Sequence, residues 1–94
     1  MQFLVLAHDG TDAEAPARRQ RVRPQHLEGI RPLAEGETLI LGGALLDEEG
    51  GMIGSAMLFE AEDEEAVRAL IEGDIYFREG VWQNFQILPF KRAV

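Results

Sequence analysis

The chain has 94 residues, of which 46% are hydrophobic and 28% are charged, the composition of one ordinary globular domain. Nine Lys and Arg residues against 17 Asp and Glu residues give a net charge of −8, which argues against nucleic acid or an anionic membrane as the main partner. No cysteine is present, so a disulfide scaffold, a Cys-ligated zinc site and a thiol nucleophile are excluded.

The apolar stretches are too short to cross a membrane. The run from Leu39 to Leu46 is far below the roughly 20 residues that a spanning helix needs. Met1 and Gln2 do not form the basic segment with which a signal peptide begins. We therefore expect a cytoplasmic protein with a single domain over residues 1–94.

The first third of the chain predicts one strand and one helix. Residues 2–8 are apolar on both faces, as in a central strand that is covered on both sides. Residues 13–23 follow a turn, are polar and are only weakly periodic, which favours a loop or a short helical turn. From Pro24 to Glu35 apolar residues recur at helical spacing, so a helix is predicted there, with Gly36 as its left-handed cap. Pro32 is expected to kink or shorten its last turn.

The remainder of the chain predicts a hairpin, a helix and a final strand. Residues 38–46 and 52–61 favour two strands, which are joined by a charged turn with two glycines. A second helix is predicted over residues 63–73, with an aspartate as its N-cap and a glycine at its end. Residues 74–80 are predicted as a compact loop, and residues 81–90 as the last strand.

The order β-α-β-β-α-β predicts an α+β fold of the ferredoxin-like type. In this fold a four-stranded antiparallel sheet carries both helices on one face. The apolar strand residues belong to two sets that cannot share one face: Leu4, Leu6, Leu39, Leu41, Met57, Phe59, Trp82 and Leu88 against Phe3, Val5, Ile40, Leu58, Phe85 and Ile87. The helices cover only one face, so we predict a homodimer in which a second copy covers the open sheet face.

Signatures of metal and phosphate sites are lacking. His8 and His26 are the only histidines, and no histidine pair has ligand spacing. Neither a phosphate-binding loop nor a dinucleotide-binding glycine pattern occurs. We therefore predict no metal and no cofactor.

His26 is the main candidate for acid–base chemistry. In the first turn of the predicted helix, the positive end of the helix dipole would disfavour the imidazolium and keep the ring neutral. A neutral imidazole acts as a base when a carboxylate orients it, and Asp74, just after the second helix, is the candidate partner. The alternative is that His26 is merely exposed or locally hydrogen-bonded and that Asp74 forms a turn.

Polar residues beyond this pair offer ligand contacts. Arg18, Arg19, Arg21 and Arg23 stand out in an acidic chain and could clamp an anionic substrate group, although internal ion pairing is the simpler explanation. Ser55 has no adjacent base, which argues against a serine hydrolase, but its hydroxyl can still donate a hydrogen bond to a ligand.

The sequence resembles the YciI-like (YCII-related) family over almost the whole chain. The resemblance is carried by His8-Asp9, Arg19, Arg23-Pro24-Gln25-His26-Leu27, Gly42-Gly43, Gly54-Ser55, Gly73-Asp74-Ile75-Tyr76, Gly80-Val81 and Leu88-Pro89-Phe90. It implies a dimeric α/β barrel of ferredoxin-like subunits with a His–Asp dyad in a pocket beside the sheet. One relative in this family is a dehydrochlorinase that acts on a chlorinated hydroxyhydroquinone.

The resemblance also implies roles for individual residues. The catalytic dyad falls on His26 and Asp74, and the substrate-binding residues fall on Asp9, Arg23, Gly43 and Ser55. Two positions differ from the family pattern, which often has proline where this chain has Ile75 and commonly has proline where it has Ala44.

Two functional hypotheses from different classes follow. The first is a small cofactor-free enzyme of the lyase or isomerase kind, in which His26 moves a proton on a small aromatic or anionic substrate and Asp74 orients the ring. The second is a non-catalytic dimeric module that binds a small ligand or a partner protein, in which the pair only holds the first helix in place. Cofactor-free oxygenase chemistry is a further alternative by analogy of fold.

Overall fold

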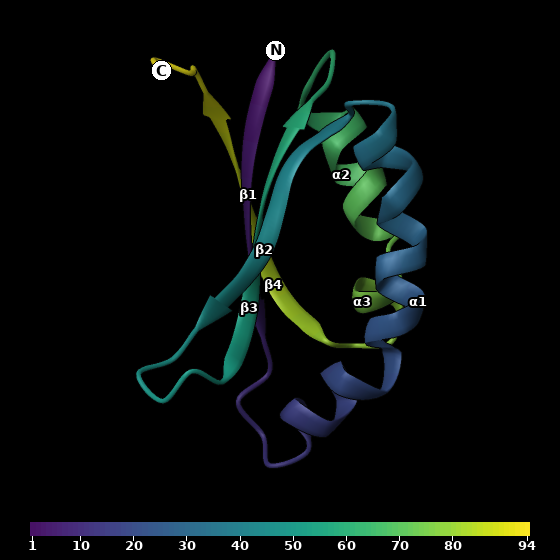
Figure 1. The fold of residues 1–94 in the computed structure, drawn as a ribbon, viewed down its shortest axis with the longest axis vertical. Helices are drawn as coiled ribbons and strands as arrows, with labels where there is room; N and C mark the ends of the chain where they lie inside the picture. The colour runs from purple at the N-terminus through teal and green to yellow at the C-terminus, as the bar shows by residue number, and fades with distance from the viewer.

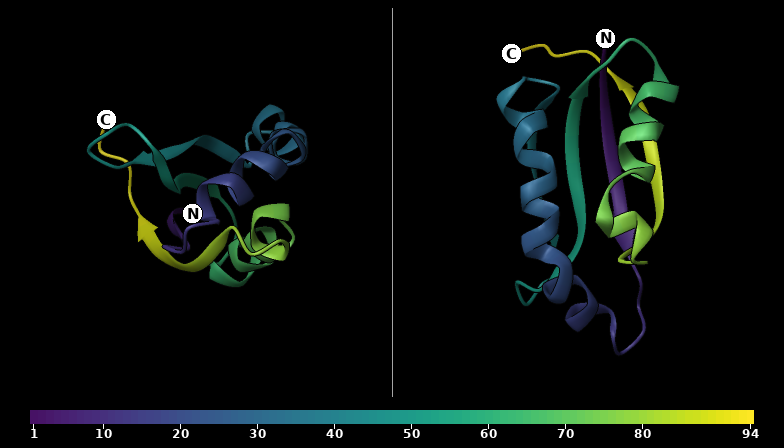
Figure 2. Two further views of the ribbon diagram at one scale, coloured as in Figure 1. Left: turned by 90° about the horizontal axis from the view of Figure 1, so that it is seen from below. Right: turned by 90° about the vertical axis from the view of Figure 1, so that its right-hand side faces the viewer.

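The computed structural model describes residues 1–94, which form one four-stranded antiparallel sheet with helices on one of its faces (Figures 1 and 2). The elements are β1 (Gln2–Asp9), α1 (Ala15–Glu35), β2 (Leu39–Leu46), β3 (Met52–Glu60), α2 (Glu64–Glu72), α3 (Ile75–Arg78) and β4 (Trp82–Phe90). The strand order is β2-β3-β1-β4. The predicted α+β, ferredoxin-like fold is therefore confirmed, with a third, short helix added. None of the helices is long and apolar enough to span a membrane.

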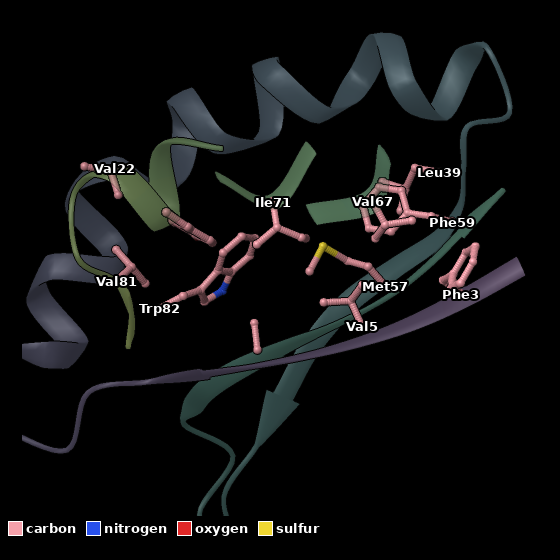
Figure 3. Close-up of a cluster of buried hydrophobic side chains, with 12 residues drawn as sticks. Phe3, Val5, Val22, Leu39, Met57, Phe59, Val67, Ile71, Val81 and Trp82 are labelled. Carbon is pink, nitrogen blue, oxygen red and sulfur yellow. The ribbon is translucent and has the colours of Figure 1, made fainter. Parts of the chain in front are cut away.

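The core lies between the sheet and the helices (Figure 3). Phe3 of β1 pairs with Phe59 of β3, and Val5 pairs with Met57, so alternation along both strands points these side chains to the same face. The buried side chains of α2 pack on them at helical spacing, chiefly Val67 and Ile71. The helix-covered face of the two central strands thus forms the floor of the core.

The opposite face of the sheet carries a row of leucines across all four strands. Leu41 of β2 pairs with Leu58 of β3, Leu58 pairs with Leu4 of β1, and Leu4 pairs with Leu88 of β4. We call these four residues the leucine row. No helix lies on this face, which is seen edge-on in Figure 1, although Leu58 within the row is only 6% exposed.

The predicted grouping of apolar residues by face was partly wrong. Leu39, Met57, Phe59 and Trp82 are buried with Phe3 and Val5, on the helix-covered face, whereas Leu58 lies on the open face. The registers shift in β2 between Leu39 and Leu41 and in β4 between Trp82 and Asn84, which pair with Asp9 and His8 of β1. Each irregularity reverses the alternation of side chains, and nothing in the sequence marks its position.

Helix α1 starts well before the predicted position at Pro24 and includes most of residues 13–23, which were expected to form a loop or a short helical turn. Pro16 occupies the first turn, where no backbone N–H is needed. The buried residues Ala15, Arg19, Val22 and His26 recur every three or four positions, but one of them is an arginine, so the apolar periodicity was hidden. The first turns of α1 run at an angle to the rest of the helix (Figures 1 and 2), which we attribute to the internal Pro24.

Two predicted connections also differ from the structure. Gly36 ends α1 with an ordinary φ of −85°, and Glu37 has the left-handed conformation, with φ of 61°. Residues 74–80, expected to be a loop, contain α3, whose N-cap Asp74 accepts a hydrogen bond from the backbone N–H of Tyr76 at 2.8 Å. By capping α3, Asp74 holds its carboxylate in one position. The predicted N-cap Asp63 of α2 is confirmed by its bond to the backbone N–H of Ala66.

Candidate active site

A cavity of about 130 Å³ lies between α1, β2, β3 and α3. Arg19, Arg23 and His26 of α1 line it at positions i, i+4 and i+7, which is one face of a helix. Ser55 of β3 and Tyr76 of α3 complete its polar lining. The cavity therefore brings together residues from four separate elements.

His26 and Asp74 form a hydrogen-bonded pair. His26 Nδ1 lies 2.8 Å from Asp74 Oδ1, and each side chain is only 9% exposed. A carboxylate only accepts, so the neutral ring carries its proton on Nδ1 and leaves the lone pair of Nε2 available to a substrate. The pair thus has the geometry of a base with an orienting carboxylate.

The position of His26 within α1 corrects one part of the prediction. His26 lies in the middle of α1 and not in the first turn of a helix, because α1 begins at Ala15. The helix dipole acts within the first and last turns, so it does not extend to His26. The Asp74 carboxylate and the neighbouring rings are what surround the imidazole.

Two aromatic rings that the sequence analysis did not assign to the site hold His26 in place. The ring of Tyr76 stacks on the imidazole with a centroid distance of 3.9 Å and an interplanar angle of 9°. Trp82 meets the imidazole edge-on at 5.8 Å. The one available clue was the spacing of Tyr76, two residues after Asp74. For Trp82, which lies at the start of β4, no comparable clue exists in the sequence.

Arg19 links Asp9 to Ser55 inside the protein. Its side chain is 4% exposed. Nη1 donates to Asp9 Oδ1 at 2.9 Å and to Oδ2 at 3.0 Å, while Nη2 donates to Ser55 Oγ at 3.1 Å. Trp82 Nε1 also donates to Ser55 Oγ, at 3.1 Å. Because Ser55 Oγ accepts two hydrogen bonds, its own hydrogen is free to be donated into the cavity. Arg19 and Ser55 together form a donor pair for a developing negative charge, which we call the Arg19–Ser55 donor pair.

The six predicted site residues fall into two layers. Arg23, Gly43, Ser55 and His26 line the cavity directly, whereas Asp74 lies behind His26 and Asp9 lies behind Arg19. Arg23 is half-buried and forms no ion pair, which leaves its charge available to an anionic ligand.

Gly43 leaves open space where a side chain would stand. On the far side of His26, Asp74 borders a groove of about 370 Å³ between α1 and the α2–α3 segment. No group of three or more His, Cys, Asp or Glu side chains is arranged to hold a metal ion.

The buried Asp9 makes stability depend on pH. Burial raises the pKa of the Asp9 carboxyl, because its loss of solvation outweighs the opposing effect of the Arg19 guanidinium. A pKa that is higher in the folded chain gives a stabilising contribution at low pH, and this contribution is lost as the pH rises through the folded-state value. We therefore expect the unfolding free energy of wild type, relative to Asp9→Asn, to be largest at acidic pH and to shrink towards neutrality.

Urea denaturation of both proteins at a series of pH values measures this difference. The matched control is Asp12→Asn, at an exposed aspartate whose pKa is lowered by its hydrogen bond with Arg18. Here the unfolding free energy of wild type relative to the variant should fall as the pH becomes acidic. If the unfolding free energy of wild type relative to Asp9→Asn instead grows with pH, the attraction of Arg19 outweighs the loss of solvation and lowers the pKa of Asp9.

The chain is similar to proteins of one family along nearly its whole length. The family model of the YCII-related domain matches residues 1–91. Protein YciI of Escherichia coli O6:H1 is 30% identical over 99 residues, covering 99% of this chain and 99% of that protein. The derivative of benzaldehyde biosynthesis cluster protein C of Emericella nidulans is 37% identical over 82 residues, which cover 80% of this chain and 84% of that protein.

A solved structure shares the fold. It is that of 5-chloro-2-hydroxyhydroquinone dehydrochlorinase from Burkholderia phenoliruptrix AC1100 in complex with 2,5-dihydroxybenzoquinone. The TM-score is 0.84 at 23% identity, with 99% of this chain and 96% of that chain covered. With the family model matched over residues 1–91 and protein YciI aligned end to end, the chain belongs to the YCII-related domain family.

Proposed function

We propose that this protein is a small enzyme that transfers protons on a hydroxylated ring substrate, and that it does so without a cofactor. The observation that carries this proposal is the cavity in which a carboxylate-oriented His26 lies beside the Arg19–Ser55 donor pair. A base and a site for the oxyanion it creates are the two parts that such chemistry needs. The dehydrochlorinase activity of the structural neighbour supports the same class of reaction.

The proposed reaction starts at Nε2 of His26. This nitrogen removes a proton from a substrate hydroxyl, and Asp74 stabilises the imidazolium that forms. The negative charge on the substrate oxygen is met by Ser55 O–H and by the Arg19 guanidinium, while the half-buried Arg23 attracts an anionic substrate into the cavity.

A chlorinated hydroquinone illustrates the balance of atoms and electrons. One hydroxyl proton moves through His26 to the ring carbon that bears chlorine, and chloride then leaves with the electron pair of its bond to carbon. A second hydroxyl proton is released, so two C–O–H groups become carbonyls and the net loss is HCl. The carbon that loses chlorine is reduced while the two carbons that bear the hydroxyl groups are oxidised, so the reaction needs no external oxidant.

The experiment that tests this proposal is turnover by wild type and His26→Asn. Chloride release from 5-chloro-2-hydroxyhydroquinone is the first readout, because this compound is the substrate named for the structural neighbour. Other hydroxylated rings are then followed by their absorbance. Turnover that is independent of His26, or its absence with every ring tested, contradicts the proposal.

A second candidate function is a non-catalytic module that binds a small ligand. The observation that favours it is the packing of His26 between Tyr76, Trp82 and Asp74, which fits a role in holding α1 against α3. This candidate predicts ligand binding without chemical change to the ligand.

We further propose that the protein is a homodimer whose subunits meet through the leucine row. An apolar row that runs across all four strands is the kind of surface that a second subunit covers. Leu41 and Leu88, at its two ends, are 57% and 42% exposed in the single chain. Burial of these side chains in a sheet-to-sheet contact would stabilise the dimer.

Introducing a charge into the leucine row is expected to separate the subunits. Light scattering should give twice the chain mass of 10.5 kDa for wild type and the mass of one chain for Leu88→Glu, because an unpaired carboxylate would be buried in the interface. Ile53→Glu is the matched control, since Ile53 is 48% exposed and lies near the start of β3, beside the residues that connect β1 to α1 and away from the leucine row. A monomeric wild type, or a dimer that survives Leu88→Glu, contradicts this interface.

A further inference from the structure

Tyr76 has a hydroxyl group that the protein itself does not satisfy. The residue is fully buried, at 0% exposure, and its hydroxyl oxygen has no hydrogen-bond partner. It is also a lining residue of the cavity that holds His26 and Ser55. A phenylalanine would give the same ring packing without leaving a polar atom unpaired, so packing alone does not explain a tyrosine here.

The remaining contacts of Tyr76 hold it in one place relative to the dyad. Its ring lies flat on His26, and its backbone N–H donates to the same Asp74 oxygen that receives His26 Nδ1. The guanidinium carbon of Arg19 lies 4.8 Å from the centre of the ring, on its face. The hydroxyl is therefore carried by a ring that contacts both the proposed base and the Arg19–Ser55 donor pair.

The hydroxyl is a hydrogen-bond donor at neutral pH. Burial raises the pKa of the Tyr76 phenol, and the charges of Arg19 and Arg23 oppose this rise without reversing it. A protonated phenol has one hydrogen to donate, and no acceptor of the protein receives it. An acceptor oxygen on a bound ligand would remove the cost of this unpaired buried group.

We propose that Tyr76 is a specificity-determining residue, whose hydroxyl donates a hydrogen bond to an oxygen of the substrate. This inference rests on the proposed function and names its substrate class more closely. The substrate is a ring with at least two oxygen functions, one at the Arg19–Ser55 donor pair and a second at Tyr76. A ring with a single oxygen satisfies only one of these two places and binds more weakly.

The test compares Tyr76→Phe with wild type in binding two probes, 2,5-dihydroxybenzoquinone and phenol. Trp82 is the only tryptophan and donates to Ser55 at the cavity, so its fluorescence reports binding. We expect Tyr76→Phe to weaken the binding of 2,5-dihydroxybenzoquinone about 10-fold, the value of one hydrogen bond, and to leave phenol binding unchanged. Thr38→Val, which removes one hydroxyl outside the cavity lining, is the control and should leave both affinities unchanged.

A second measurement detects the hydrogen bond directly. Tyr76 is the only tyrosine, so labelling with tyrosine enriched in 13C at Cζ gives a single resonance, and this resonance should move when 2,5-dihydroxybenzoquinone binds. The melting temperature of Tyr76→Phe should equal or exceed that of wild type, since the free protein loses no hydrogen bond. A lower melting temperature with unchanged affinity would show that the hydroxyl is structural and would overturn the inference.

The outcomes separate this inference from the proposed function. Equal affinity of wild type and Tyr76→Phe for 2,5-dihydroxybenzoquinone, or no binding by wild type, overturns the role of Tyr76. If affinity falls as expected but no ring substrate is turned over in a His26-dependent way, the role of Tyr76 in binding stands and the proposed catalysis fails.

Discussion

Replacing His26 by asparagine is expected to lower turnover by about 10²–10⁴-fold, the usual contribution of a general base. Asparagine places an amide N–H close to the position of Nδ1, so it can still donate to Asp74 Oδ1 at the site of the present 2.8 Å bond. It has no counterpart of Nε2, the atom to which we assign the proton transfer. The substitution therefore removes the base and keeps the contact between α1 and the N-cap of α3.

Steady-state kinetics and thermal unfolding, measured on the same samples, check this prediction. Gln25→Asn is a suitable control, because Gln25 precedes His26 on α1 and its side chain is exposed. Loss of the stacking with Tyr76 is expected to lower the melting temperature of His26→Asn under either hypothesis, so turnover is the readout that separates them. In the enzyme, wild type turns over a ring substrate and His26→Asn does not, although both are folded at the assay temperature. In a non-catalytic module, wild type has no turnover to lose.

The second large effect is expected from Arg19→Leu, which should lower the free energy of unfolding by about 3–5 kcal/mol at neutral pH. The substitution leaves the buried Asp9 carboxylate without both of its hydrogen bonds, and Ser55 loses one of its two donors. A loss of this size is a large part of the roughly 5–15 kcal/mol that stabilises a typical domain. The loss should be smaller at acidic pH, where Asp9 takes up a proton.

Urea denaturation of three further variants tests the cause of this loss. Arg18→Leu breaks a bidentate but exposed pair with Asp12, so it should barely change stability. The double substitution Asp9→Leu with Arg19→Leu removes both buried charges and should recover most of the stability. If the double variant is as unstable as Arg19→Leu alone, the unpaired carboxylate is not the cause.

The strands and α2 were predictable because their sequence patterns are local. Helix α2 has an N-cap aspartate, Asp63, and an apolar stripe that repeats every three or four positions. The hairpin of β2 and β3 is marked by a charged turn with two glycines. Helix α1 was placed too late because Arg19 occupies a buried position on its inner face. An arginine at such a position interrupts the apolar pattern by which a buried helix face is recognised in a sequence. Its burial is favourable only because it pairs with Asp9, which the sequence does not show.

The site was predictable in its residue types but not in its arrangement. His26 and Asp74 are 48 positions apart, and Arg19 and Ser55 are 36 positions apart, so their contacts depend on how the elements pack. Both the sequence pattern and the resemblance to a known family paired His26 with Asp74, but the sequence pattern placed His26 wrongly at a helix start. Tyr76 was missed because its role depends on a stacking partner and an unpaired hydroxyl, which are properties of packed side chains.

The sequence by itself determined the order of the strands and main helices and the ferredoxin-like class. It also showed that the strands carry more apolar surface than two helices can cover. These features were predictable because periodicity, caps and turn residues act over a few neighbouring positions. The tertiary structure alone decided which apolar residues face the helices, since a bulge of one residue reverses a strand's alternation. It also decided that a buried arginine joins Asp9 to Ser55 and that His26 lies between a carboxylate and a tyrosine ring. Such contacts form only when distant segments exclude water together, and local sequence does not encode that geometry.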